Sequence, residues 1–229
     1  AQISVRRSME DPAYDSDVNV RGLLNLLHNF EAGRLPHFVM ISTGGAIYGE
    51  QDVFPAPERH PIRPASVYGV SKYVREIYLD LWSRVYGLKF VALRLANVYG
   101  PRQNPHGEAG VVAIFSRKLF MGEPPAINGN GEQTRDFIFV KDVADAVVRV
   151  TTQKVQGIYN IGTGIETSVN SLYNLIAAAS GTSVSPLHSG AKSGEQMRSC
   201  IDASFATREF GWKAVTSLEV GINETVHWF

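Results

Sequence analysis

Apolar residues recur at helical spacing in several long segments of the chain. Between residues 11 and 33 they follow the three- and four-residue steps of one helical face, and a glycine at 33 offers a stop. Residues 66–86 repeat the pattern over a comparable length. These segments predict two long helices. Shorter helices are predicted at 111–120, 143–150, 168–179 and 218–229.

Four shorter apolar runs indicate strands between these helices. They cover residues 37–42, 90–98, 135–140 and 157–162. Strands that alternate with helices of this length form parallel sheets, because the chain must cross back over the sheet before the next strand begins. The pattern therefore predicts an α/β fold, with helices packed on a parallel sheet.

Composition limits the partners and the compartment. The 22 lysines and arginines equal the 22 aspartates and glutamates, so no overall field draws the chain to nucleic acid or to an anionic membrane. The single cysteine, Cys200, excludes an internal disulfide framework, and the six histidines have no metal-site spacing. No apolar run approaches the roughly 20 residues of a membrane span. We expect a soluble, cytoplasmic protein without a bound metal.

Tyr68 and Lys72 bring candidate chemistry to the predicted helix 66–86. Positions four residues apart lie on one helical face, so both side chains point into the same space. A lysine charge beside a phenol stabilises the phenolate and lowers the tyrosine pKa, which makes the tyrosine a usable base near neutral pH. The pair by itself is weak evidence, since a tyrosine beside a solvated lysine also arises by chance.

Hydroxyls and glycines follow the predicted strand 37–42. The stretch "ISTGGAIYGE" places Ser42 and Thr43 there, followed by glycines that let a ligand approach the backbone. With Tyr-x-x-x-Lys starting 25 positions after Thr43, the chain resembles the extended short-chain dehydrogenase/reductases of the NAD-dependent epimerase/dehydratase family. Within that family it is most similar to the UDP-glucose 4-epimerases and their nucleotide-sugar relatives. The similar blocks run nearly end to end and include "YGVSKYVRE", "LRLANVYGPRQNPHGEAGVVAIF", "GNGEQTRDFIFVKDVADA" and "YNIGTG".

The resemblance implies a nucleotide-sugar 4-epimerase of the UDP-galactose/UDP-glucose type. In such enzymes NAD takes a hydride from carbon 4 of the sugar while a tyrosinate takes the hydroxyl proton, and the hydride then returns to the other face. The resemblance assigns Tyr68 as the base and Lys72 as the group that lowers its pKa and binds the nicotinamide ribose. Thr43 would hydrogen-bond the sugar oxygen, with Ser42 as the alternative hydroxyl. Asn19 would either support this set or make an ordinary helix-face contact.

Cofactor and substrate positions follow from the same resemblance. The implied NAD-binding residues are Ser42, Tyr68, Lys72, Leu95, Asn97 and Val98. The implied UDP-sugar-binding residues are Thr43, Asn97, Gly110, Val111, Arg135, Lys192, Glu195 and Ser199. Arg135 would clamp the diphosphate with its planar fork, or else form a surface ion pair. Lys192 stands where the family usually has arginine, and the small Ser199 would leave room for an N-acetyl group.

Two features depart from the patterns of relatives. Dehydratases of the family carry an Asp-Glu pair directly after the catalytic threonine, whereas this chain has Gly44-Gly45 and so lacks that acid and base. The family's amino-terminal glycine-rich loop, which meets the cofactor pyrophosphate, has no counterpart here. We therefore expect a Rossmann-like parallel sheet without its amino-terminal strands, active only when that segment or an equivalent is present.

The resemblance also implies how the chain is organised. Residues 1–98 plus 134–165 would form a partial Rossmann-like dinucleotide-binding domain, and residues 99–133 plus 166–229 a smaller C-terminal α/β lobe for the nucleotide sugar. A sheet that lacks strands exposes an apolar edge, so we expect association through that edge or a homodimer through the two long helices. The UDP-sugar is the expected small-molecule partner, and no nucleic acid or membrane partner is expected.

Two other functions stay open at this point. One is a cofactor-free esterase or hydrolase that uses Thr43 or Ser42 with Tyr68 and Lys72. The other is an inactive truncated remnant that binds a sugar nucleotide without turning it over. Bound NAD favours the epimerase, whereas ester turnover that is indifferent to NAD favours the hydrolase.

Overall fold

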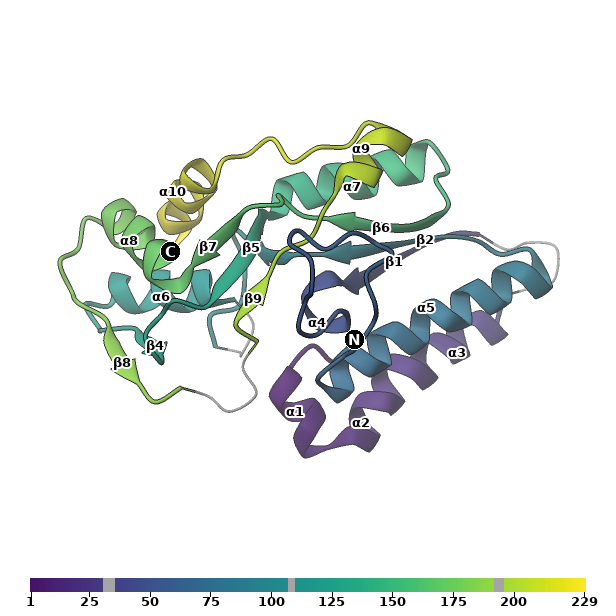
Figure 1. The fold of residues 1–229 in the computed structure, drawn as a ribbon, viewed down its shortest axis with the longest axis horizontal. Coiled ribbons are helices and arrows are strands. Elements are labelled where there is room, and N and C mark those ends of the chain that lie inside the picture. Colours follow the sequence, from purple (N-terminus) through teal and green to yellow (C-terminus); the bar gives the residue numbers. More distant parts are fainter. Residues whose placement is uncertain (31–35, 107–109, 192–195) are drawn as a thin grey trace.

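A three-stranded parallel sheet forms the centre of the molecule (Figure 1). The computed structural model describes residues 1–30, 36–106, 110–191 and 196–229. The strand order is β1-β2-β6, and the strands span His37–Thr43 (β1), Lys89–Leu95 (β2) and Gly157–Ile161 (β6). The predicted parallel α/β arrangement is confirmed.

Helices cover both faces of this sheet (Figure 1). On one face lie α5 (Val67–Tyr86) and α3 (Gly22–His28), and on the other α7 (Val140–Thr152) and α9 (Ser204–Phe210). The first layer buries Leu23, Leu27, Met40, Leu79, Leu88, Phe90 and Ala92. The second buries Val91, Leu93, Val150, Phe210 and Trp212, among others. Residues of β2 alternate between these two clusters, as the pleat of a strand requires.

The predicted helix at 11–33 is divided. It consists of α2 (Pro12–Ser16), a π-helical turn η1 (Asp17–Arg21) and α3, and it is preceded by α1 (Val5–Glu10). The helical residues end at His28, so the predicted end at Gly33 is wrong. Apolar spacing does not reveal this end, because Phe30 continues the apolar pattern beyond the helix and packs against the same core cluster.

The strand predicted at 90–98 is in fact two strands in two sheets. Ala96 breaks it: its N–H donates to the carbonyl of Ile161 at 2.9 Å, and the next residues leave for a second sheet as β3 (Asn97–Tyr99). That sheet also holds β5 (Thr134–Phe139), β7 (Glu166–Ser168) and β9 (Arg198–Ser199), with β5 in contact with each of the others. A continuous apolar run gives no sign of such a change of sheet.

The remaining elements pack around the second sheet. A cluster that includes Tyr99, Phe115, Phe137, Leu172 and Ile222 joins it to α6 (Val111–Phe120), α8 (Val169–Ser180) and α10 (Leu218–Trp228). Two short strands, β4 (Ala126–Asn128) and β8 (Leu187–Ser189), pair beside it, and α4 (Gly44–Ile47) follows β1. Since α9 packs on the first sheet, the two-lobe division at residues 165 and 166 stays a prediction. No helix in the described ranges has the length and apolar character needed to cross a membrane.

Candidate active site

The two hydroxyls at the end of β1 have different surroundings. Ser42 is 3% exposed, and its Oγ donates a hydrogen bond of 2.5 Å to Glu76 Oε1 on α5. Thr43 is half-buried, and its Oγ1 accepts from the N–H of Ala46 at 3.3 Å, so it caps α4. The Ser42 hydroxyl is therefore enclosed and bound to Glu76, and a contact of Ser42 with the cofactor or the sugar stays a prediction.

Tyr68 and Lys72 lie together at the amino-terminal end of α5. Ser66 caps this helix by accepting from the N–H of Gly69 at 3.1 Å, which fixes where the helical turn begins. Lys72 Nζ lies 5.6 Å from the centroid of the Tyr68 ring and donates to the Ile41 carbonyl at 3.2 Å. The four-residue spacing therefore gives the shared face that it predicts, directly beside the end of β1.

Burial dominates the electrostatics of this pair. Burial raises the pKa of Tyr68 to about 12; the Arg75 cation opposes this shift, and the Asp15 carboxylate adds to it. Burial, followed by the Arg75 charge, lowers the pKa of Lys72 to about 8, against the effect of Asp15. Desolvation outweighs the nearby charges in setting the Tyr68 pKa, and the lowering of this pKa by Lys72 stays a prediction.

Three predicted side chains meet around Gly45. A Cβ placed there would lie 3.6 Å from Asn97 Oδ1, 3.8 Å from Ser199 Oγ and 4.0 Å from Thr43 Oγ1. These polar atoms come from β3, β9 and β1, so the junction of the two sheets gathers them at one point. Gly44 faces the other way: a Cβ there would lie 2.9 Å from the buried side chain of Ile201.

Arg135 lies beside this point in the second sheet. It is the register partner of Ser199 in the β5–β9 pair, and its Nη1 donates to the Thr134 carbonyl at 2.8 Å. Gly110 begins α6 with φ of +102°, and the side chain of Gln103 fills the space where a Cβ would stand. Val111, the first residue of α6, is half-buried and packs against the core next to the second sheet. Lys192 and Glu195 lie outside the described residues.

The predicted positions Leu95, Val98 and Asn19 lie in the packed layers next to the site. Leu95 is the register partner of Thr43, and both it and Val98 pack in the core under α7. Asn19 lies in the π-helical turn, is 2% exposed, and donates to Gln2 O at 3.0 Å and to Asp15 Oδ1 at 3.1 Å. In this structure the Asn19 side chain therefore hydrogen-bonds to neighbouring residues of the amino-terminal segment, Gln2 and Asp15.

Sequence reasoning missed a buried ionic network behind Ser42. Arg94 Nη2 lies 2.6 Å from Glu76 Oε2, and Arg94 Nη1 donates to the Tyr48 hydroxyl at 2.9 Å. The Tyr48 hydroxyl donates in turn to Asn160 Oδ1 at 2.8 Å. Burial alone would lower the Arg94 pKa, but the hydrogen bonds that Arg94 donates to the Glu76 carboxylate raise it above its ordinary value. An arginine inside the apolar run "FVALRLANV" is the signal that could have revealed this network.

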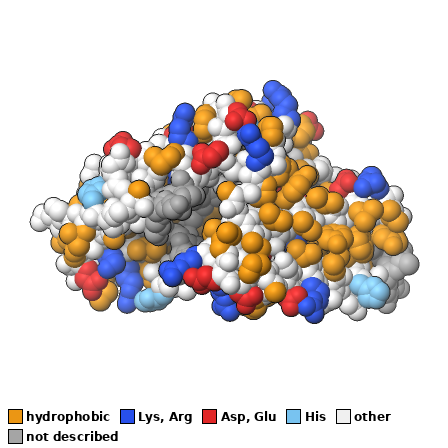
Figure 2. Space-filling model, turned by 60° about the horizontal axis from the view of Figure 1, so that its bottom comes forward, with side chains coloured by type: hydrophobic (Ala, Val, Ile, Leu, Met, Phe, Trp, Pro, Cys, Tyr) orange, Lys and Arg blue, Asp and Glu red, His pale blue; other side chains and the backbone are white. Residues whose placement is uncertain are grey.

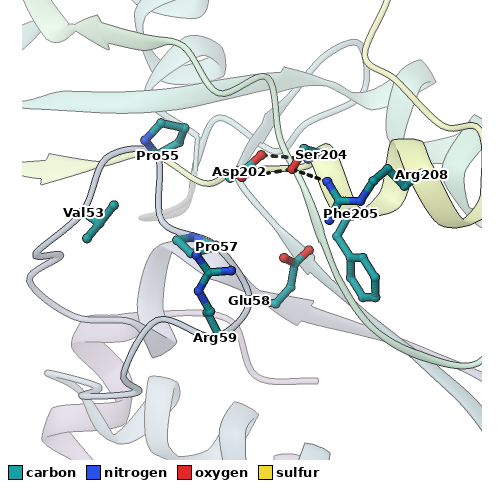
Figure 3. A pocket seen from close by; sticks show the side chains of 9 residues that line it. All are labelled: Val53, Pro55, Pro57, Glu58, Arg59, Asp202, Ser204, Phe205 and Arg208. Carbon is teal, nitrogen blue, oxygen red and sulfur yellow. Dashed lines mark hydrogen bonds between the residues drawn. The ribbon is translucent and has the colours of Figure 1, made fainter.

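A pocket of about 500 Å³ lies elsewhere, between the loop at 53–59 and α9 (Figure 3). Its polar groups bind one another: Ser204 Oγ donates to Asp202 Oδ2 at 3.1 Å and accepts from Arg208 Nη1 at 3.2 Å. None of the predicted site residues lines it. The candidate chemistry therefore stays at the end of β1, where the polar side chains converge.

The chain is similar to proteins of known activity. The profile of the "NAD dependent epimerase/dehydratase family" matches residues 1–162. A putative UDP-glucose 4-epimerase from Methanocaldococcus jannaschii is 45% identical over 228 residues, which are 100% of this chain and 74% of that protein. The structure of a UDP-glucose 4-epimerase with UDP-glucose from Thermotoga maritima matches with a TM-score of 0.95 at 43% identity, over 100% of this chain and 74% of that one. A Thermus thermophilus UDP-glucose 4-epimerase in complex with NAD gives 0.92 at 40% identity, over 100% and 75%.

Proposed function

The chain belongs to the NAD-dependent epimerase/dehydratase family, and we propose that it interconverts UDP-galactose and UDP-glucose with Tyr68 as the base. Nucleotide-sugar 4-epimerisation with NAD is the activity of relatives that match this chain along its whole length. The observation that carries the residue assignment is the convergence of Thr43, Asn97 and Ser199 around Gly45, beside Tyr68 and Lys72.

Each group at the end of β1 has one chemical task. Tyr68 holds the hydroxyl that accepts a proton from the sugar alcohol and later returns it. Lys72 holds a positive charge 5.6 Å from the Tyr68 ring and so stabilises the phenolate form. Thr43 orients the sugar oxygen with its hydroxyl. With Ser42 bound to Glu76, the proposed reacting hydroxyl is Thr43.

The described residues suit NAD at this place. Lys72 has three donor hydrogens, and its one hydrogen bond within the described ranges goes to Ile41, which leaves donors for ribose hydroxyls. Ile41 is 40% exposed and offers an apolar surface next to it. Bound NAD would supply the hydride acceptor. Asn97 and the backbone near Leu95 and Val98 would line the cofactor side of the site.

The second sheet suits the nucleotide diphosphate. Arg135 lies next to Ser199 in register and would offer a planar fork to paired oxygens. The backbone N–H groups at Gly110 and Val111, where α6 begins, would add donors for phosphate. The two-lobe division is part of this proposal, with the substrate between the sheets. Lys192 and Glu195 stay predictions as further substrate contacts.

Elimination chemistry fits this site poorly. The family's dehydratases were expected to need an acid and a base at positions 44 and 45. A Cβ at position 44 would lie 2.9 Å from the buried Ile201 side chain, so Ile201 would have to shift to admit a carboxylate side chain there. Position 45 faces the converging hydroxyls but supplies no proton carrier, because it is glycine. The site therefore favours epimerisation.

Tyr68→Phe tests the assignment. The ring remains but no phenol is left to take the proton, so we expect kcat to fall by about 100-fold or more, with a small change in KM. The assay follows UDP-galactose conversion to UDP-glucose by a coupled dehydrogenase. Tyr73→Phe on the same helix is the matched control and should keep the parent rate. A Tyr68→Phe enzyme as fast as the parent would remove Tyr68 from the mechanism.

We propose further that two copies pair through α3 and α5, and that the enzyme works in the cytoplasm. Figure 2 shows hydrophobic side chains gathered over the side of the molecule where these helices lie. On α5 the exposed aliphatic residues are Val70, Ile77, Leu81 and Val85, which share one helical stripe. Ile77→Lys should yield monomers in sedimentation velocity, whereas Val148→Lys, 61% exposed on α7, should not.

A further inference from the structure

A carboxylate is enclosed where α2 meets the helix that carries Tyr68 and Lys72. Asp15 is 0% exposed, and α2 and η1 both contact α5. Asp15 Oδ1 accepts from Gln2 Nε2 at 2.8 Å and from Asn19 Nδ2 at 3.1 Å. Asp15 Oδ2 has no hydrogen-bond partner in the part of the chain that the structure describes. Both donors are neutral, so a buried negative charge needs its stabilisation from elsewhere.

Most ionisable groups on the elements packed around Asp15 are paired elsewhere, so few of them can interact with its carboxylate. On α1 and the start of α2, Arg7 stacks at 4.2 Å on the exposed ring of Tyr14, and Arg6 pairs with Glu10. The charges of η1 pair with each other at the surface, and Arg94 of β2 pairs with Glu76 on the sheet side of α5. The groups that interact electrostatically with this part of α5 are Asp15, Tyr68, Lys72 and Arg75.

We propose that Asp15 is a positioning residue that acts through Lys72: its buried negative charge keeps the Lys72 ammonium charged beside Tyr68. The effect on catalysis rests on the proposed function, whereas the effect on Lys72 does not. Geometry supports the assignment, because Lys72 is itself only 5% exposed and its one hydrogen bond within the described residues goes to the neutral Ile41 carbonyl. A buried ammonium with a neutral partner loses its proton readily unless an anion is near.

The directions of the charge effects agree with this role. Burial and Arg75 both lower the pKa of Lys72, which reaches about 8, and Asp15 opposes them. Asp15 also raises the pKa of Tyr68. Removal of the Asp15 charge therefore lowers both values. Lys72 would then deprotonate close to neutral pH, and Tyr68 would ionise more easily.

Because removal of the Asp15 charge lowers both pKa values, the pH profile of the reaction distinguishes an electrostatic role of Asp15 from a purely structural one. A reaction that needs an ionised tyrosine and a charged lysine has a bell-shaped pH profile whose two limbs lie at the two pKa values, about 8 for Lys72 and about 12 for Tyr68. Neutralisation of Asp15 moves both limbs to lower pH. A residue that only held α2 against α5 would, when changed, lower the profile without moving it.

The test is a titration of Lys72 that requires no turnover. The protein is labelled with ¹³C-lysine, and the Lys72 side-chain signal is assigned by its loss in Lys72→Arg. In Asp15→Asn, which keeps the side-chain shape, and in Asp15→Ala, the midpoint should fall by at least about half a pH unit. Asp17→Asn is the matched control: it makes the same charge change two residues away, on a side chain that is 54% exposed, and should leave the midpoint unchanged.

The remaining lysine signals report whether each variant keeps its fold. An unchanged Lys72 midpoint in both folded Asp15 variants overturns the proposal. The kcat profile of Asp15→Asn with NAD and UDP-galactose gives the second measurement, in which both limbs should shift to lower pH. A profile that is reduced but not shifted also overturns it. Absence of epimerase activity in the parent protein, assayed with the amino-terminal glycine-rich segment or an equivalent present, would instead reject the proposed function and leave the titration result standing.

Discussion

Removal of the Arg94 guanidinium should lower the melting temperature, Tm, of the protein by several degrees. Arg94 and Glu76 have side chains that are 4% and 1% exposed, and the guanidinium donates hydrogen bonds to both carboxylate oxygens. In Arg94→Leu the Glu76 carboxylate stays buried, with Ser42 as its one remaining donor in the described structure. Breaking a buried pair in this way costs about 3–5 kcal/mol. At about 2–4 °C per kcal/mol for a domain of this size, Tm should fall by about 6–20 °C.

Thermal unfolding followed by circular dichroism measures this fall. Arg84→Leu is the control, because it breaks an ion pair with Asp80 on the same helix, at side chains that are 66% and 56% exposed. An exposed pair contributes less than about 0.5 kcal/mol, so its Tm should change by about 2 °C or less. The double variant Arg94→Leu/Glu76→Leu should recover part of the loss, since no charge is left unpaired. An Arg94→Leu protein whose Tm equals that of the Arg84→Leu protein would refute the reasoning.

Three further predictions concern the site. Arg135→Ala should raise the KM for the UDP-sugar by about tenfold or more and change kcat by less than about threefold, since the diphosphate does not react; a fall in kcat alone would contradict the assignment. Gly44→Ala should be less stable than Gly45→Ala by about 1–3 kcal/mol in urea unfolding, because its Cβ would meet Ile201 at 2.9 Å whereas the nearest atom at Gly45 lies at 3.6 Å. Lys72 has a pKa of about 8 in the folded protein against an ordinary 10.5, so the unfolded state binds more protons and the free energy of unfolding rises between about pH 8 and 10; Lys72→Met should flatten that rise of up to about 3 kcal/mol.

The parts of the site that depend on local spacing could be predicted from the sequence. Tyr68 and Lys72 share a face because a helix fixes the relation of positions four residues apart. β1 and α5 were predicted to within one residue at each end, because a short apolar run and a long amphipathic one differ in period. Resemblance to a family then brought together Thr43, Asn97 and Ser199, which no local pattern connects.

The parts that depend on burial could not be predicted. The Tyr68 pKa follows from how much water the packed helices exclude, and the desolvation of the phenol opposes the effect of neighbouring cations. The enclosure of Asp15 is likewise a property of helix packing, since its neighbours in the sequence, Tyr14 and Ser16, are both exposed. The choice between Ser42 and Thr43 required knowing which face of β1 meets Glu76.

The single residue between β2 and β3 has a mechanical consequence. Leu95 is bonded into one sheet and Asn97 into the other, and Ala96 between them is itself tied to Ile161. A connection of one residue leaves little freedom for the two sheets to move apart as rigid bodies. Admission and release of a sugar nucleotide would then fall to surface loops, and the width of the gap between Thr43 and Asn97 would stay nearly constant through a turnover.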